Sequence, residues 1–248
     1  MHRFFIKKQD IESDSVTIEG NIARQISKVL RLVKGDYITV MDGTNWEYRI
    51  ILDEINPRRI LGTIMEKLKC YGEPKCPITL YQGVLKGHKF ETVLQKGTEL
   101  GITRFVPVIC ERTIPRGDGL SSDHKLDRYM TIVREASEQS HRGVIPTIGK
   151  TLPLDEALRI SDGHRIILWE QETAIGINDQ LNDKGLDSSQ GISLFVGPEG
   201  GFTNREIRCS VNYGLIPVTL GKRILRAETA SLAAVVLVLS SLGEFSSQ

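Results

Sequence analysis

The sequence predicts an α/β protein in which a small β-rich domain precedes a larger domain built on a mostly parallel sheet. Two observations predict the larger domain. Short apolar runs alternate with helical patterns from residue 78 onward, and two of these runs lead directly into glycine-containing loops. A third observation places the division, because residues 71–77 combine one glycine with two prolines, a composition typical of a linker. We therefore expect domains at residues 1–70 and 78–248.

The first domain contains four segments with the composition of β-strands. Asp42-Gly43 and Asn56-Pro57 are turn signals between the later ones. The predicted strands are Phe4–Ile6, Tyr37–Met41, Glu47–Ile55 and Arg59–Met65.

A short helix is expected between the first two of these strands, with Asn21 as its N-cap and Gly35 shortly after its end. Its inward-facing residues are predicted to be Ile22, Ile26, Val29 and Leu30. A basic stripe at positions i, i+4 and i+7 consists of Arg24, Lys28 and Arg31. Such a stripe suits RNA phosphates, and a solvated helix face explains it equally well.

The second domain is predicted from alternating strands and helices, and its last apolar run, Ala230–Leu242, is interpreted as a buried helix. That run is too short to span a bilayer, which takes about 20 residues. The predicted strands are Ile78–Gln82, Phe105–Ile109, Ile166–Trp169, Ile192–Val196 and Ile216–Leu220, and the predicted helices between them cover residues 89–100 and 124–139.

Composition limits the possible functions. The chain has 248 residues, of which 40% are apolar and 25% charged, so it can bury a substantial core. The formal net charge of +1 requires any nucleic-acid surface to be a local patch. The four cysteines show no zinc-ligand spacing, and the first residues lack a signal-peptide core, so we expect no metal, no membrane association and a cytoplasmic location.

Two loops are the best candidates for a ligand site because both follow strands of the predicted parallel sheet. They are Val196–Thr203 and Leu220–Ala230, and glycines in both allow close approach of a ligand to the backbone. Lys222, Arg223 and Arg226 precede a helix whose N-terminal dipole disfavours cations. We therefore expect an anion nearby, either a carboxylate such as Glu199 or Glu228 or a nucleic-acid phosphate. The alternative is a set of solvated side chains beside a structural turn.

The motifs Gly197-Pro-Glu-Gly-Gly-Phe202 and Leu220-Gly-x-Arg-Ile-Leu-Arg-x-Glu-Thr-Ala230 resemble those of the bacterial RsmE family. The resemblance extends to Lys96-Gly-Thr-Glu-Leu-Gly101 and to Val29-Leu30-Arg31 near the N-terminus. It implies a SPOUT methyltransferase domain with a trefoil knot, the knot and cofactor site covering about residues 166–236, and a PUA-like N-terminal β-barrel that binds RNA. It also implies a homodimer that uses S-adenosylmethionine to methylate N3 of a uridine in 16S ribosomal RNA, with the 30S subunit as its partner. Gln25 and His141 depart from the family pattern.

The resemblance also implies roles for individual residues. Uridine N3 carries a proton, so methylation needs a base and stabilisation of the developing oxyanion. The predicted catalytic residues are Arg226, Glu228, Arg223 and Arg142, with Glu199 as the alternative base. The predicted cofactor-binding residues are Leu168, Glu170, Gly197, Glu199, Gly200, Leu220, Leu225, Thr229 and Ala230. The predicted RNA-binding residues are Arg3, Arg24, Lys28, Arg31, Lys86 and Lys89.

Two other functions stay open on the sequence. A non-catalytic RNA-binding or ribosome-assembly protein could keep this fold, although it would be expected to have lost the two pocket motifs. A SPOUT enzyme acting on transfer RNA or on another ribosomal base would keep them.

Overall fold

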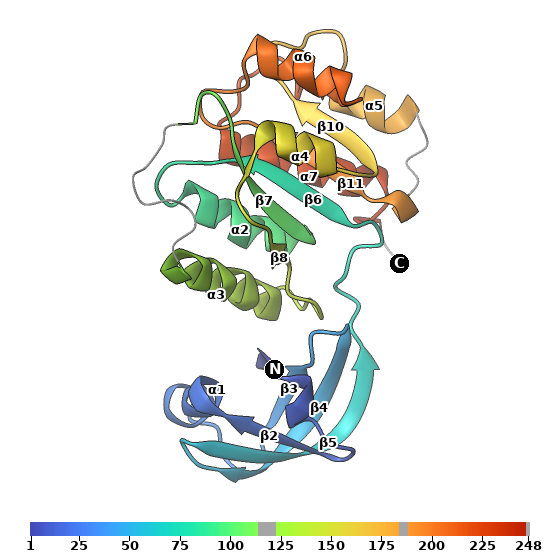
Figure 1. Cartoon of the computed structure of the whole chain (residues 1–248). Helices are drawn as coiled ribbons and strands as arrows, with labels where there is room; N and C mark the ends of the chain where they lie inside the picture. The colour runs from blue at the N-terminus through green and yellow to red at the C-terminus, as the bar shows by residue number, and fades with distance from the viewer. Residues whose placement is uncertain (114–122, 184–187, 247–248) are drawn as a thin grey trace. The chain divides into compact units, whose positions relative to one another are not determined.

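The computed structural model describes residues 1–113, 123–183 and 188–246, and these form two compact units. Unit 1 consists of Met1–Glu73 together with Ser137–Ile145, and unit 2 consists of Pro74–Ala136 and Pro146–Gln248 (Figure 1). A segment from the middle of the chain therefore belongs to the N-terminal unit, which the sequence did not predict. Among the described residues, no helix is long and apolar enough to cross a membrane.

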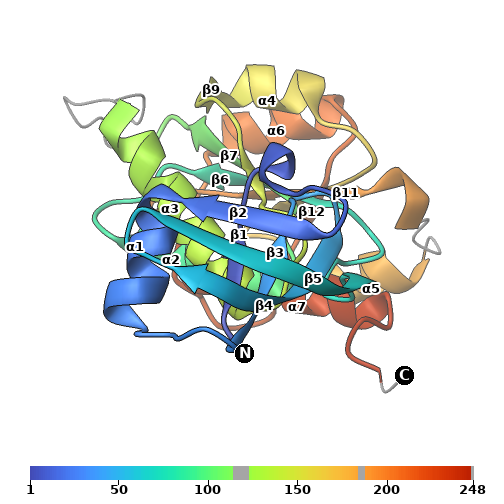
Figure 2. The ribbon, with the colours of Figure 1, turned by 90° about the horizontal axis from the view of Figure 1, so that it is seen from below.

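Unit 1 is a curled five-stranded sheet with the order β1-β3-β4-β5-β2 (Figure 2). All pairs are antiparallel except β1 with β3. Two register shifts between β4 and β5 bend the sheet. The strands are β1 Arg3–Phe5, β2 Ser15–Glu19, β3 Tyr37–Met41, β4 Trp46–Ile55 and β5 Arg59–Lys69, and a 3-10 turn, η1, covers Lys8–Asp10.

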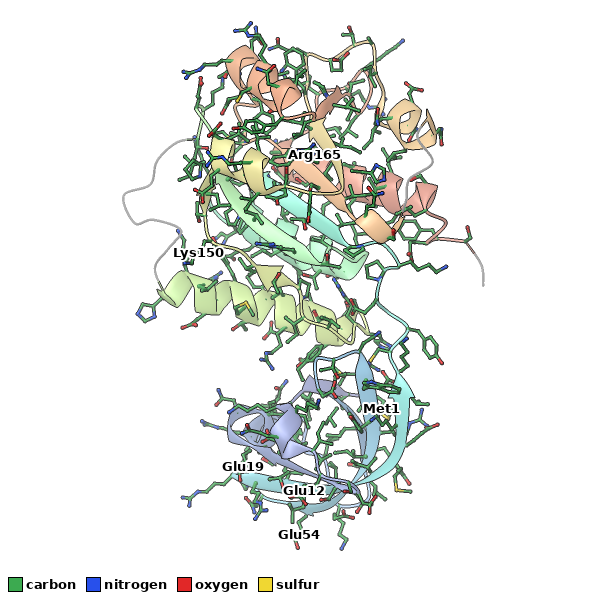
Figure 3. All side chains as sticks on the ribbon, turned by 45° about the vertical axis from the view of Figure 1, so that its right-hand side comes forward. Met1, Glu12, Glu19, Glu54, Lys150 and Arg165 are labelled. Carbon is green, nitrogen blue, oxygen red and sulfur yellow. The ribbon has the colours of Figure 1, made fainter. Side chains whose placement is uncertain are left out.

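The core of unit 1 is formed by the inward side chains of these strands, including Val16, Ile38 and Ile60, none of which is exposed. Charged residues such as Glu19 and Glu54 are exposed on its surface, where Figure 3 labels them. Strand β2 was missed because only two of its five residues are strongly apolar, although they alternate inward as a strand requires.

The helix of unit 1 differs from its prediction in two respects. It begins at Gly20, after Glu19, so the prediction of Asn21 as the N-cap was wrong. Helix α1, Gly20–Arg24, then continues as a wider π-helical turn, η2, over Gln25–Val29. This turn changes the angular spacing of the side chains that follow, and Val29 is 72% exposed instead of facing the core.

The basic stripe of this helix is shorter than predicted. Arg24 and Lys28 are exposed within the helical turns. Arg31 lies beyond the helix and has a φ of 54°, so the predicted i+7 relation does not hold for it. Arg31 is exposed as well, so the RNA contact predicted for Arg24, Lys28 and Arg31 stays a prediction.

Unit 2 contains a parallel sheet with the order β12-β10-β11-β6-β7-β8, and β9 also pairs with β7. This confirms the predicted α/β class. The strands are β6 Ile78–Gly83, β7 Arg104–Ile109, β8 Thr147–Ile148, β9 Leu152–Pro153, β10 His164–Leu168, β11 Ile192–Val196 and β12 Ile216–Val218. Every residue of the central strand β11 is buried, which explains why four of its five residues are apolar, and the one polar residue, Ser193, donates its hydroxyl to the carbonyl of Asp162.

Helices cover both faces of this sheet. Helices α4 and α6 contribute Leu158 and Ile207 to one core cluster with β7, β10 and β11. Helices α2 and α7 pack against each other, and α7 also contacts β11 (Figure 1). The helices are α2 Lys89–Leu100, α3 Asp123–Gln139, α4 Leu154–Ile160, α5 Ile177–Asp183, α6 Asn204–Asn212 and α7 Ala227–Ser241, and a 3-10 turn, η3, covers Ser188–Gln190.

Two boundaries near the predicted ligand loops differ from expectation. Strand β12 ends at Val218 instead of Leu220, and α7 begins at Ala227, with Arg226 as its N-cap residue. Glu228 and Thr229 therefore lie in the first turn of a helix. The expected trefoil knot stays a prediction.

Candidate active site

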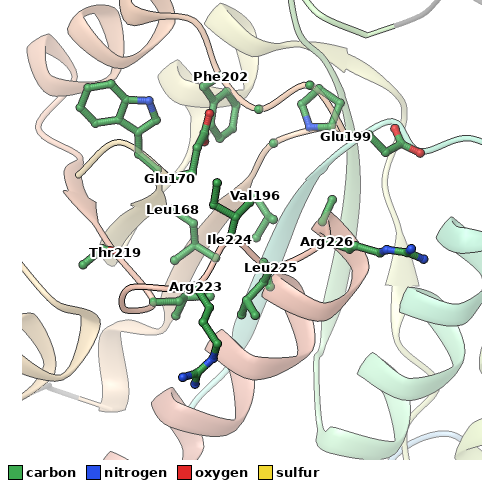
Figure 4. Close-up of a pocket in the computed structure, with 18 of the residues that line it drawn as sticks. Leu168, Glu170, Val196, Glu199, Phe202, Thr219, Arg223, Ile224, Leu225 and Arg226 are labelled. Carbon is green, nitrogen blue, oxygen red and sulfur yellow. The ribbon is translucent and has the colours of Figure 1, made fainter. Parts of the chain in front are cut away.

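A cavity of about 780 Å³ lies at the carboxyl ends of β10, β11 and β12 (Figure 4). These strands are neighbours, since β10 pairs with both β11 and β12, so the loops that follow them meet at one edge of the sheet. The lining residues are Leu168–Glu170, Val196–Phe202 and Val218–Ala227, with Lys89 and Ala230. The structure thus brings the two predicted loops to one pocket and adds a third, the loop that follows β10.

The loop after β11 requires its glycines. Gly201 has a φ of 68°, a backbone conformation that L side chains rarely adopt, so any residue with a Cβ atom would be strained there. The loop ends in a capping box at the start of α6, in which Thr203 Oγ1 accepts from Glu206 N and the Glu206 carboxylate accepts from Thr203 N. Arg112 adds a hydrogen bond of 2.7 Å from Nη1 to the carbonyl of Gly200.

The loop after β12 carries exposed cations. Gly221 has a φ of 101°, and its N–H donates to Thr219 Oγ1 at 3.2 Å, which tightens the turn. Arg223 and Arg226 extend in different directions from this loop (Figure 4). Ile224 between them is 83% exposed. The sequence prediction did not single out Ile224, and only its place inside the loop could have indicated it.

The expected internal partners of these cations are engaged elsewhere. The described part of the chain contains no ion pair to Lys222, Arg223 or Arg226, so the carboxylate alternative, Glu199 or Glu228, is not found and the nucleic-acid phosphate stays a prediction. Both carboxylates instead lie near a lysine of α2. The arginines consequently have their full donor capacity available to an anionic ligand.

Lys89 is that lysine. Its Nζ lies 3.2 Å from Glu199 Oε1 and 3.8 Å from Glu228 Oε2, so it connects α2 with both pocket loops. This places Lys89 in the pocket lining, and its predicted RNA contact stays a prediction. Lys86 donates its backbone N–H to Glu199 Oε1 at 3.0 Å, and its side chain is exposed.

The two candidate bases differ in their surroundings. Burial by itself would raise the pKa of Glu199, but hydrogen bonds from the backbone N–H groups of Lys86 and Glu199 and from the Lys89 ammonium lower the pKa below its ordinary value. Glu228 has one carboxylate oxygen, Oε2, that is buried and makes no hydrogen bond. Glu199 lines the cavity, whereas Glu228 does not, and Glu228 Oε2 lies 3.8 Å from the Lys89 ammonium.

Most predicted cofactor residues line the cavity. These are Leu168, Glu170, Gly197, Glu199, Gly200, Leu220, Leu225 and Ala230. Thr229 does not, because its position in the first turn of α7 directs it to the exposed side. Trp169 also lines the cavity, and its indole Nε1 is buried without a hydrogen-bond partner among the described residues. A buried donor of this kind indicates that a ligand or water acceptor belongs beside it.

Arg142 lies outside the cavity lining and belongs to unit 1. Its side chain is 1% exposed, and its Nη2 and Nε lie 2.8 and 3.3 Å from the Glu73 carboxylate. The same carboxylate accepts from the N–H groups of Gly143 and Val144. This arrangement gives Arg142 a packing role within unit 1 and does not support the predicted catalytic role.

Arg3 is likewise internal. Its side chain is 9% exposed, and its Nη2 lies 2.5 Å from Glu47 Oε2. An arginine held in this way is a poor phosphate contact, so its predicted RNA-binding role is not supported.

Comparison with known proteins agrees with this geometry. Residues 72–239 match the family described as an RNA methyltransferase domain. The ribosomal RNA small subunit methyltransferase E of Synechocystis sp. is 33% identical over 96% of this chain and 77% of its own length. That of Bacillus subtilis is 30% identical over 94% of both chains.

Solved structures extend the likeness to three dimensions. The crystal structure of a ribosomal RNA small subunit methyltransferase E from Neisseria gonorrhoeae bound to S-adenosyl methionine has a TM-score of 0.86 and 31% identity over 97% of both chains. A methyltransferase from Legionella pneumophila in complex with the same cofactor has a TM-score of 0.85 and 27% identity, covering 96% of this chain and 97% of its own. With its fold, its pocket motifs and its relatives in agreement over nearly its whole length, the chain belongs to the RsmE family of small-subunit ribosomal RNA methyltransferases.

Proposed function

We propose that this protein transfers a methyl group from S-adenosylmethionine to N3 of a uridine in 16S ribosomal RNA, acting on the assembled 30S subunit. The observation that carries the proposal is the pair Arg223 and Arg226, which have no internal ion-pair partner in the described chain and flank a cavity built from backbone loops. Relatives with this fold are bound to S-adenosyl methionine.

The cavity residues fit such a cofactor. The cavity has a volume of about 780 Å³, which lies within the range of small-molecule sites, roughly 300 to 1,000 Å³. Backbone groups at Leu168, Gly197, Leu220 and Leu225 would hold the nucleoside, and the buried Trp169 Nε1 supplies a donor that lacks an acceptor. When bound, the cofactor supplies an electrophilic methyl group on a sulfonium.

The chain's own residues would prepare the nucleophile. Uridine N3 must lose its proton, and Glu228 is the proposed acceptor because its Oε2 accepts no hydrogen bond from the described residues, whereas the Glu199 carboxylate accepts from Lys86 N and Lys89 Nζ. Glu228 lies outside the cavity lining with Oε2 3.8 Å from Lys89 Nζ, so this role requires its side chain to turn toward the cavity. Removing the proton places negative charge on the uracil oxygens. Arg223 and Arg226 carry permanent charges and forked donors, which suit that developing oxyanion or the adjacent phosphate.

We also propose that the protein acts as a homodimer. Helix α7 leaves Val236 37% exposed, with Leu232 and Leu237 only half-buried, and the loop before it exposes Ile224.

In unit 1, the exposed Arg24 and Lys28 support the proposed RNA contact.

The test is a methyl-transfer assay with labelled S-adenosylmethionine and 30S subunits that lack the modification, followed by mass spectrometry of the digested nucleosides. The expected product is 3-methyluridine at one site. Cofactor binding with methylation of a different base would contradict the proposed target, and absence of cofactor binding would contradict the enzyme assignment.

A variant pair tests the arginine role in the same assay. Arg226→Ala should lower kcat by roughly 100- to 1,000-fold, as for loss of one transition-state donor, while cofactor affinity stays nearly unchanged. The control is Arg205→Ala, since Arg205 is 85% exposed, pairs weakly with Glu111 at 3.6 Å and does not line the cavity. A fully active Arg226→Ala enzyme would exclude the catalytic role.

A further inference from the structure

A buried amide lies directly behind the pocket. Gln82, near the end of β6, is 0% exposed and does not line the cavity. Its Nε2 lies 3.1 Å from the carbonyl of Gly83 and 3.2 Å from the carbonyl of Gly197. The amide therefore ties β6 to the first residue of the loop after β11. Because β6 and β11 are adjacent parallel strands, this bond closes the end of their ladder.

The other end of the same amide reaches α7. Gln82 Oε1 accepts a hydrogen bond from Ser231 Oγ, and Ser231 is also 0% exposed. Ser231 Oγ lies 2.9 Å from the carbonyl of Ala227 as well, so the hydroxyl touches the first turn of α7 and the amide together. Loss of one of these bonds would leave a buried polar atom unsatisfied, which destabilises the fold. The bonds therefore favour one arrangement of β6, the Gly197 loop and α7.

Close backbone packing restricts movement of the Gly197 loop relative to β6. A Cβ atom on Gly83 would lie 2.4 Å from Pro198 N and 2.6 Å from the carbonyl carbon of Gly197, so the two chain segments are in direct contact. Gly197, Ala227 and Ala230 line the cavity, whereas Gln82 and Ser231 do not. The buried pair thus lies between two walls of the cavity and contacts both through their backbones.

We propose that Gln82 and Ser231 are positioning residues that set the spacing between the Gly197 loop and the first turn of α7, and thereby the affinity for the methyl donor. The inference rests on the proposed function, because it assumes that S-adenosylmethionine occupies this cavity. It assigns to two residues that touch no ligand a measurable effect on binding.

The chain contains a matched control for Ser231. Ser210 in α6 is also a 0% exposed helix serine, and its Oγ donates to the carbonyl four residues earlier, Glu206, at 2.8 Å. Ser231 Oγ lies in the equivalent place, 2.9 Å from the carbonyl of Ala227, and its single proton is shared between that carbonyl and Gln82 Oε1. The two serines differ in that Ser231 also reaches Gln82. Comparing Ser231→Ala with Ser210→Ala therefore separates the positioning effect from the general loss of a buried helix hydroxyl.

The experiment measures the dissociation constants of S-adenosylmethionine and S-adenosylhomocysteine by calorimetry, with the melting temperature of each variant recorded alongside. Ser231→Ala should weaken binding about 10-fold, and Ser210→Ala should stay within twofold of wild type even if both lower the melting temperature equally. In steady-state assays, Ser231→Ala should raise KM for the cofactor by more than it lowers kcat.

A second variant protects the test against misfolding of the first. Gln82→Leu should weaken cofactor binding at least as much as Ser231→Ala. The double variant should raise the dissociation constant by less than the product of the two single factors, because both substitutions remove the same hydrogen-bond network. If both folded single variants bind the cofactor within twofold of wild type, the positioning role is overturned. If the wild-type protein itself does not bind, the proposed function fails, and this inference fails with it.

Discussion

Gly83→Ala gives a sharp test of how tightly the pocket loop is held. Gly83 is the buried last residue of β6, and its backbone conformation is open to any residue, so the substitution acts through sterics alone. The added Cβ would lie 2.4 Å from Pro198 N and 2.7 Å from Pro198 Cδ, whereas ordinary contact begins at 3.4 Å. Both neighbours belong to the loop backbone, so the loop must move away from β6 by about 1 Å.

The expected losses of activity and of stability follow from that displacement. A misplacement of about 1 Å in a catalytic site lowers activity roughly 100-fold, which corresponds to about 2.7 kcal/mol of transition-state stabilisation. Overpacking of the same site should lower the free energy of unfolding by about 1 to 3 kcal/mol and the melting temperature by roughly 2 to 12 °C.

The assay is kcat/KM for methyl transfer to 30S subunits, measured below the onset of unfolding, together with the dissociation constant of S-adenosylmethionine. The control is Gly149→Ala, which lies outside the cavity lining and whose Cβ would meet a side-chain methyl of Val106 at 3.2 Å. The control should retain activity within about threefold. If Gly83→Ala keeps wild-type affinity and kcat/KM, the reasoning that the Gly197–Pro198 backbone is immobilised by β6 is refuted.

Three further predictions concern charge. Glu73→Ala should lower the free energy of unfolding by about 3 kcal/mol, because it removes the carboxylate that pairs with the buried Arg142 guanidinium and accepts from two N–H groups. Glu66→Ala, which removes a half-exposed ion pair, should lower the free energy of unfolding by about 0 to 1 kcal/mol. Urea denaturation checks both, and equal losses would contradict the buried-pair argument. Because the pKa of Glu199 is lowered in the folded protein, its carboxylate stabilises the fold at pH values above its ordinary pKa of 4.5, and this stabilisation is lost as the pH falls through the lower folded pKa. The difference in melting temperature between wild type and Glu199→Gln should therefore shrink below about pH 4.5. A difference independent of pH would argue against the lowered pKa. Arg24→Ala with Lys28→Ala should weaken RNA binding and reduce the slope of log K against log salt by roughly 0.7 to 0.9 per residue in filter-binding assays, and an unchanged slope would remove both from the RNA contact.

The sequence by itself determined the elements whose signals are local. Helix α2 begins and ends at the predicted residues, and strand β11 matches its apolar run residue for residue. The two glycine-containing loops were also identified, because a loop that follows a parallel strand falls at one edge of the sheet whatever the rest of the chain does. Periodicity, glycine and strand composition are properties of neighbouring residues, so they can be read without the fold.

Weak or interrupted local patterns were read less well. Strand β2 has only two strongly apolar residues, and a π-helical turn moves Val29 to the surface although its spacing predicted the core. For β2, packing of Val16 and Ile18 in the sheet core overrides the weak local preference, whereas for Val29 the wider helical turn changes which face the side chain occupies.

Only the tertiary structure decided which charged and polar groups meet. Lys89 pairs with Glu199, 110 residues away, and Gln82 meets Ser231 across 149 residues. Arg142 has a sequence position that suits either a catalytic or a structural role, and its acceptor, Glu73, lies 69 residues earlier. Ion pairs and buried hydrogen bonds depend on distances of a few ångströms between side chains, and such distances follow from how distant segments pack and not from the order of residues along the chain.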